Sequence, residues 1–198
     1  MGEVTVDAVS APGSTSTTGA KSQLQMRIVL HVDATGKVRL LKDAIVLPRA
    51  GGTGTGSVIV TKPELLSTLP VERNVQFKSN GRRFSSVAFD FTDNDSTPGD
   101  NALELQGGVG QNFECFGTLT LASSHPTNPF RHKFHPDHAN TGDKAYTITR
   151  TLKFSFTQPM VTTAGVETLS LGQYTETITG LHAAAITTGG TLQLSRIT

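Results

Sequence analysis

Short segments in which apolar and polar residues alternate, separated by turn-forming residues, dominate this chain and restrict it to β structure. One side of residues 24–32 is entirely apolar and consists of Leu24, Met26, Ile28, Leu30 and Val32. Residues 146–157 repeat the pattern over a similar length. A period of two residues is typical of a strand that buries one face. About ten such segments follow one another, so we expect an all-β protein, an antiparallel β-sandwich or jelly roll.

Two tight turns and one short helix complete the predicted architecture. Residues 33–36 join two strands as a hairpin turn, because Gly36 can take the positive φ that such a turn requires. The glycine pair at 189–190 predicts another hairpin near the C-terminus. Residues 61–70 carry the signals of a short helix, with a threonine able to cap its start and a proline at its end.

The N-terminal segment differs from the rest of the chain. Residues 3–9 alternate like a strand, whereas residues 10–22 are rich in serine, threonine and glycine and read as a flexible linker. A length of 198 residues suits a single domain. We therefore divide the chain into residues 1–22, an N-terminal strand and linker, and residues 23–198, one β-sandwich domain.

The N-terminal strand is the predicted assembly element. Its apolar positions are Val4, Val6 and Val9. A strand of this kind either pairs within its own domain or adds to the sheet edge of a neighbouring subunit. The formal net charge is +1, so little electrostatic repulsion opposes self-association. We therefore expect a homo-oligomer or polymer.

Charge and hydropathy exclude several classes of partner. Lysine and arginine number 17 and aspartate and glutamate 16, and no basic run extends beyond Arg82-Arg83, so nucleic acid is not expected as a partner. No apolar stretch approaches the roughly 18 residues of a membrane-spanning helix. The first residues lack the basic and apolar regions of a signal peptide.

No residue of the chain is predicted to be catalytic. Cys115 is the only cysteine, so it forms no internal disulfide, and its place in an alternating segment predicts a buried, inert thiol. The GxSxG pattern of a serine nucleophile is absent from the sequence.

The densest group of potential ligands lies in residues 125–140, which hold four of the six histidines and three prolines. Imidazole and carboxylate groups bind zinc and related ions, so a candidate transition-metal site consists of His132, His135, Asp137 and His138. A structural divalent ion would suit this set better than a catalytic one. In the alternative interpretation, which we favour, the histidines are partly exposed hydrogen-bond donors that fix a loop.

A second candidate site is acidic. Calcium takes about six to eight oxygen ligands, and four carboxylates lie close together in the sequence at Asp90, Asp93, Asp95 and Asp100. The EF-hand pattern fails, because Pro98 occupies the place of its central glycine. The alternative, which we again favour, is a solvated turn.

Two parts of the chain, residues 26–33 with 38–41 and residues 128–138, together resemble an uncharacterised β-rich module found in large bacterial proteins predicted to be exported or surface-attached. The resemblance covers about residues 24–157 and is most specific at the histidine loop. It implies a location outside the cell and a structural role, and it implies no activity.

These observations predict a non-enzymatic structural or adhesive subunit of an extracellular or cell-surface assembly, such as a filament, that assembles through N-terminal strand exchange. Two alternatives stay open. One is a metal-binding jelly-roll protein or enzyme that uses the histidine loop, and the other is a virion coat or decoration subunit.

Overall fold

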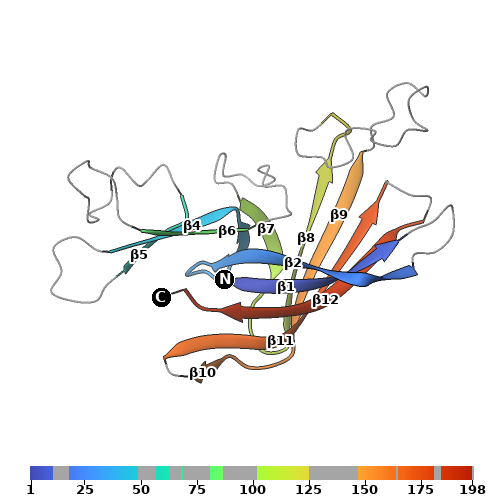
Figure 1. The fold of residues 1–198 in the computed structure, drawn as a ribbon. Helices are drawn as coiled ribbons and strands as arrows, with labels where there is room; N and C mark the ends of the chain where they lie inside the picture. The colour runs from blue at the N-terminus through green and yellow to red at the C-terminus, as the bar shows by residue number, and fades with distance from the viewer. Residues whose placement is uncertain are drawn as a thin grey trace.

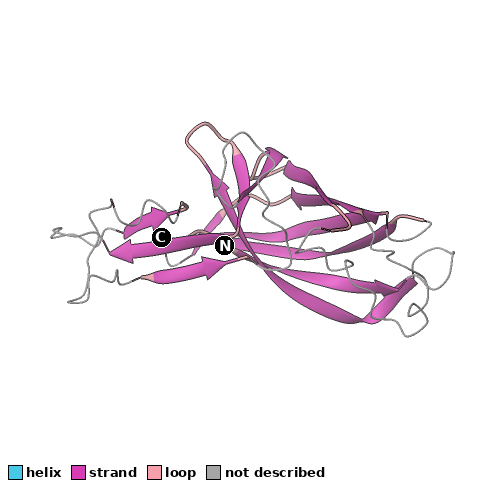
Figure 2. Ribbon diagram, turned by 90° about the horizontal axis from the view of Figure 1, so that it is seen from above, coloured by secondary structure: helices cyan, strands magenta, loops and turns pink. Residues whose placement is uncertain are grey.

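The computed structural model describes residues 1–10, 18–48, 57–62, 68, 81–86, 102–124, 147–163, 165–180 and 184–197. All regular secondary structure in these residues is β-strand, and none of them is helical (Figure 1, Figure 2). The strands are β1 (Gly2–Ser10), β2 (Thr18–Val32), β3 (Val38–Leu41), β4 (Asp43–Pro48), β5 (Ser57–Val60), β6 (Arg82–Ser85), β7 (Ala102–Gly107), β8 (Phe113–Leu121), β9 (Ile148–Phe156), β10 (Val161–Thr163), β11 (Val166–Thr179) and β12 (Ile186–Ser195).

Eight strands form a closed antiparallel barrel. Their order around the barrel is β1, β2, β3, β7, β8, β9, β11 and β12, so each strand pairs with the next barrel strand along the chain. Closure is completed where β12 pairs with β1, with Val4 opposite Leu192. The all-β, antiparallel prediction is confirmed. The predicted sandwich or jelly roll gives way to a barrel, because the first and last strands pair with each other and close one sheet on itself.

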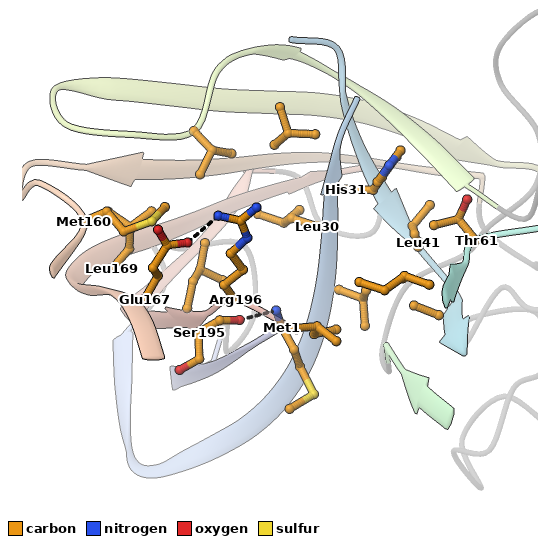
Figure 3. Close-up of a pocket in the computed structure, with 17 residues that line it drawn as sticks. Met1, Leu30, His31, Leu41, Thr61, Met160, Glu167, Leu169, Ser195 and Arg196 are labelled. Carbon is orange, nitrogen blue, oxygen red and sulfur yellow. Dashed lines mark hydrogen bonds and ion pairs between the residues drawn. The ribbon is translucent and has the colours of Figure 1, made fainter. Parts of the chain in front are cut away.

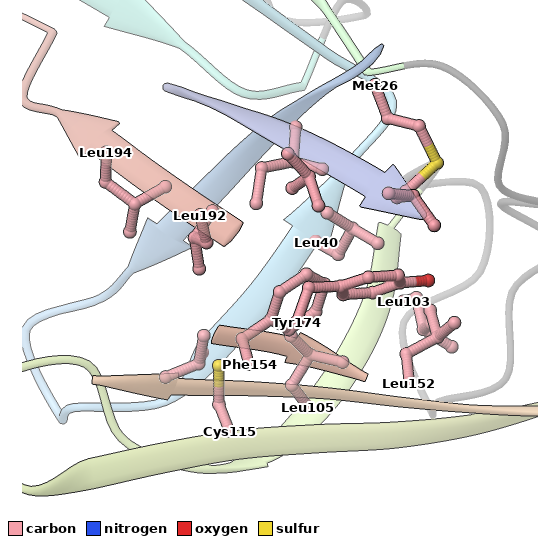
Figure 4. Packing of buried hydrophobic residues seen from close by; sticks show 14 of the residues in the cluster. Met26, Leu40, Leu103, Leu105, Cys115, Leu152, Phe154, Tyr174, Leu192 and Leu194 are labelled. Atoms are coloured by element: carbon pink, nitrogen blue, oxygen red, sulfur yellow. The ribbon is translucent and has the colours of Figure 1, made fainter. Parts of the chain in front are cut away.

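The barrel interior is filled by apolar side chains from all eight strands (Figure 4). The inward-facing residues alternate with outward-facing ones along each strand, as expected for a barrel of this size. The buried cluster comprises Val4, Val6, Met26, Ile28, Val38, Leu40, Leu103, Leu105, Cys115, Leu119, Leu121, Ile148, Leu152, Phe154, Phe156, Leu169, Tyr174, Leu192 and Leu194.

A second sheet, in the order β5-β4-β6, packs against the outside of the barrel. Val29 of β2 and Leu41 of β3 belong to a separate buried cluster, together with Ala44 of β4 and the partly buried Phe84 of β6. The Ser86 hydroxyl accepts a hydrogen bond from the Val29 backbone N–H at 2.7 Å. As a result, β2 and β3 are covered on both faces at this point.

The predicted hairpin turn at residues 33–36 is confirmed. Gly36 has a φ of 87°, and the Asp33 carboxylate accepts hydrogen bonds from the backbone N–H groups of Thr35 and Lys37. β2 and β3 pair on either side of this turn. β3 is short, since the chain leaves the barrel after Leu41 and enters the second sheet as β4.

The second predicted hairpin, at the glycine pair 189–190, is wrong. Both glycines lie within the continuous strand β12, and Gly190 pairs with Val6 on one side and Tyr174 on the other. A Cβ atom on Gly190 would lie 1.8 Å from the Thr5 carbonyl oxygen. Glycine is therefore used here for close approach of two backbones, which is one of its roles within strands.

The predicted short helix at residues 61–70 lies largely outside the described residues. Of this segment, the structure describes Thr61, Lys62 and Thr68, and none of the three is helical. The N-terminal strand predicted within residues 1–22 is present as β1, and residues 18–22 of the expected linker belong to β2. Both strands are part of the barrel. Residues 11–17 of the expected linker are not described.

The close approach at Gly190 predicts a position-specific loss of stability. Gly190→Ala should lower the free energy of unfolding by about 3 kcal/mol, because the added methyl group would force β1 away from β12. In Gly189→Ala the nearest contact is the Tyr174 carbonyl oxygen at 3.2 Å, so we expect a change within about 1 kcal/mol. Denaturant unfolding of both variants checks this, and equal losses would contradict the proposed role of Gly190.

Candidate functional site

A hollow of about 460 Å³ opens at the end of the barrel that carries the β2–β3 turn (Figure 3). We call it the rim hollow. It lies where β2 and β12 end and β11 begins, with β5 of the second sheet opposite. Its apolar lining includes Leu30, Leu41, Ile59, Leu169 and Leu194. A concave, mainly apolar site at the mouth of a barrel is a common place for a ligand.

The polar side chains of the rim hollow lie in two groups. Glu167 and Arg196 form an ion pair at 2.5 Å, and the Arg196 backbone N–H also donates to the Glu167 carbonyl oxygen. His31 and Thr61 lie on the side nearer the second sheet (Figure 3). Burial and the nearby charge of Arg39 lower the pKa of His31 from its usual 6.5. His31 is therefore neutral at pH 7, and it can both donate and accept a hydrogen bond.

A buried ion pair lies on β9 and β11, on the inner side of the barrel wall. Arg150 of β9 donates from Nε to Glu176 of β11 at 2.5 Å, and their side chains are 13% and 5% exposed. The Tyr174 hydroxyl donates to the other Glu176 oxygen at 2.7 Å. Burial, followed by the Glu176 charge, raises the pKa of Tyr174 well above its usual value, so the phenol remains protonated.

The sequence pattern contains a signal for this pair. Arg150 occupies an inward position in the alternating row of β9, and Glu176 occupies an inward position in β11. These opposite charges meet only because β9 pairs with β11. Ile178 lies opposite Arg150 and Leu152 lies opposite Glu176, so the two charged residues are diagonal neighbours on adjacent strands. The pairing of the two strands could not be predicted from the chain order alone.

A third feature is the hairpin of β10 and the first part of β11, residues 160–163 and 165–171, which we call the arm. β10 pairs with β11, and among the described strands it has no partner on its other side. Its three residues are all exposed. Met160, Val161 and Val166 are each about half exposed, so the free sheet edge is flanked by apolar side chains.

Leu171, within the arm, combines exposure with backbone strain. Its side chain is 67% exposed and its φ is 58°. The register of β11 against β12 shifts between Leu169 and Gly172, which places Leu171 in a β-bulge. A left-handed conformation costs a leucine roughly 1–2 kcal/mol. Strain of this kind at an exposed apolar residue is a reason to look for a contact there.

Neither of the two predicted metal sites lies in the part of the chain that the structure describes. The histidine site, His132, His135, Asp137 and His138, and the acidic site, Asp90, Asp93, Asp95 and Asp100, lie outside the described residues. Both therefore stay predictions. Within the part of the chain that the structure describes, no group of three or more His, Cys, Asp or Glu side chains could hold a metal ion.

The predicted assembly residues lie in β1. Val4 and Val6 are buried in the barrel interior, and β1 pairs with β12 on one side and β2 on the other. Val9 pairs with Gly19 through its backbone. In this structure β1 therefore completes the barrel of its own chain.

Comparisons with known proteins return no relative: no family model, curated protein or solved structure matches the chain. None of the described residues forms a helix long and apolar enough to cross a membrane.

The buried ion pair predicts a large effect of removing one charge. Glu176→Leu should lower the free energy of unfolding by about 3–5 kcal/mol, because Arg150 loses the carboxylate that neutralises it inside the barrel. The triple variant Arg150→Met/Tyr174→Phe/Glu176→Leu, which also removes the hydroxyl that donates to Glu176, should recover most of this loss. Urea unfolding of the two variants tests the assignment, and a loss below about 1 kcal/mol for Glu176→Leu would contradict it.

The buried thiol predicts slow chemistry in the folded state. Cys115 is fully buried, and burial, with a smaller effect of Glu114, raises its pKa to about 12. The folded protein should therefore react with a thiol reagent at pH 8 roughly a thousandfold more slowly than the unfolded protein. Thr118→Cys, an outward position on the same strand, supplies a control thiol that should react at once. Rapid labelling of Cys115 in the native protein would show that the thiol is accessible.

Proposed function

We propose that the chain is a non-enzymatic structural or adhesive subunit whose copies associate through the free edge of the arm. The observation that carries this proposal is the exposed edge of β10, flanked by Met160, Val161 and Val166. Proteins commonly protect such edges with charged residues or proline. The β10 sequence, Val161-Thr162-Thr163, contains neither.

The hairpin geometry indicates which backbone groups a partner would meet. Thr163 pairs with Val166 across a two-residue connection, and Thr162 pairs with Glu167. Residue pairs in an antiparallel ladder alternate between hydrogen-bonded and non-hydrogen-bonded. Because the pair that closes a two-residue hairpin is hydrogen-bonded, the Thr162 N–H and C=O face the free edge. A second β10 strand, antiparallel to the first, would pair with them about a two-fold axis and give a dimer.

Association by the arm leaves the barrel intact. β1 already has a partner strand on each side in its own chain, so exchange of the N-terminal strand between copies would first require the barrel to open. The arm requires no such step, which is why we favour it over strand exchange as the contact between copies.

We also propose that the protein acts outside the cell or at its surface. The support for this location is the resemblance of residues 26–33, 38–41 and 128–138 to a module of bacterial proteins predicted to be exported or surface-attached. The threonine-rich outer face agrees with a solvated environment, as in the hydroxyl pairs Thr118–Thr151 and Thr120–Thr149 between β8 and β9.

The proposal is tested by changing the free edge of the arm. Thr162→Pro removes the backbone N–H at that edge and should weaken self-association at least about tenfold, measured by sedimentation velocity over a concentration series. Thr162→Val keeps the N–H and should associate like the parent protein. Leu171→Asn should weaken association while the melting temperature stays the same or rises, since asparagine tolerates a positive φ.

A parent protein that is monomeric at all concentrations would refute the proposal. Association of Thr162→Pro at the parent's strength would also refute it. Circular dichroism of the variant shows whether the barrel is still folded, so a loss of association can be assigned to the edge.

A further inference from the structure

The rim hollow has the size and lining of a small-molecule site. Its volume of about 460 Å³ lies within the roughly 300–1,000 Å³ of typical ligand pockets. The floor is made by side chains of the barrel interior, Leu169 and Leu194, which are almost fully buried. The entrance is bordered by Ile59, which is 46% exposed. A water molecule gains little free energy by entering such a site, because most of the lining offers it no hydrogen-bond partner.

The charges around the rim hollow favour a neutral ligand. Glu167 and Arg196 neutralise each other. The Met1 amino group donates to the Ser195 carbonyl oxygen at 2.7 Å, and burial lowers the pKa of this amino group from its usual 8.0, which favours its uncharged form. A ligand carboxylate would have to compete with Glu167 for Arg196. On the opposite side, His31 and Thr61 offer uncharged hydrogen-bonding groups.

We propose that the rim hollow binds a neutral, mainly apolar molecule that carries one hydroxyl or carbonyl group. Its apolar body contacts Leu30, Leu169 and Leu194, and its polar group hydrogen-bonds to His31 or Thr61 on the side of the second sheet (Figure 3). The arm supplies Met160, Glu167 and Leu169 to the lining of the hollow, whereas Thr162 and Leu171 do not line it. The variants that test assembly therefore leave the lining of the hollow unchanged.

The test measures binding of a straight-chain alcohol, decanol, by displacement of the neutral fluorescent probe N-phenyl-1-naphthylamine from the full chain. We expect saturable binding of one molecule per chain. Ile59→Glu places a charge at the entrance and should weaken binding of both probe and alcohol at least about tenfold. Leu24→Glu is the matched control, since Leu24 is an exposed leucine on β2 that does not line the hollow, and it should leave binding unchanged.

The hydrogen bond is tested separately. His31→Phe should weaken decanol binding about tenfold and leave binding of the apolar probe nearly unchanged. Thermal unfolding of each variant shows whether it still folds.

Three results would overturn the inference. The first is the absence of saturable binding by the folded parent protein, and the second is equal binding by Ile59→Glu and Leu24→Glu. The third is tighter binding of decanoate than of decanol, which would show that the site selects an anion.

Discussion

The pairing of β1 with β12 is the interaction on which the rest of the structure depends. It brings the first and last described strands of the chain together, with Gly2 opposite Leu194 and Val6 opposite Gly190. Seven of the eight pairings in the barrel join one barrel strand to the next barrel strand along the chain, and this one closes the circle. It forms late in any pathway that builds the barrel from local hairpins, because closing so long a loop has an entropic cost that only the completed core offsets.

Closure determines where contacts with other molecules can occur. A barrel of eight strands leaves an interior just wide enough for side chains, and here apolar residues and the Arg150–Glu176 pair occupy it. Among the places that the described residues leave to partners are the rim and β10, the one strand of the large sheet that is not part of the closed circle. The rim hollow and the arm are these two places, and both lie where the chain departs from the regular barrel.

Local features of the fold were predictable from the sequence, whereas its closure was not. The apolar face of residues 24–32 and the turn at Gly36 depend on neighbouring residues. The turn was predicted correctly, and the predicted face is buried at Met26 and Ile28 but exposed at its ends, Leu24 and Val32. Whether a run of alternating strands forms two facing sheets or one closed sheet depends on pairing between distant segments, which a period of two residues does not encode. Gly190 shows the same limit: a glycine pair next to an alternating run indicates a turn, and only the position of Thr5 on the next strand explains its place within β12.

The candidate sites show the same difference between what neighbouring residues indicate and what distant pairing creates. Dense groups of ligand-type residues draw attention in a sequence, but the buried pair of Arg150 and Glu176 comes from two strands that the barrel brings together.

The central claim, that β1 completes the barrel of its own chain and leaves assembly to the arm, can be tested by nuclear magnetic resonance on a mixed sample. Two batches with different isotope labels would be unfolded together and refolded, so that exchanged strands could form. Our account predicts that contacts between the methyl groups of Val4 and those of Leu192 and Met26 arise only within one molecule. Contacts between differently labelled molecules at these residues would show that β1 is exchanged between copies and would contradict the account.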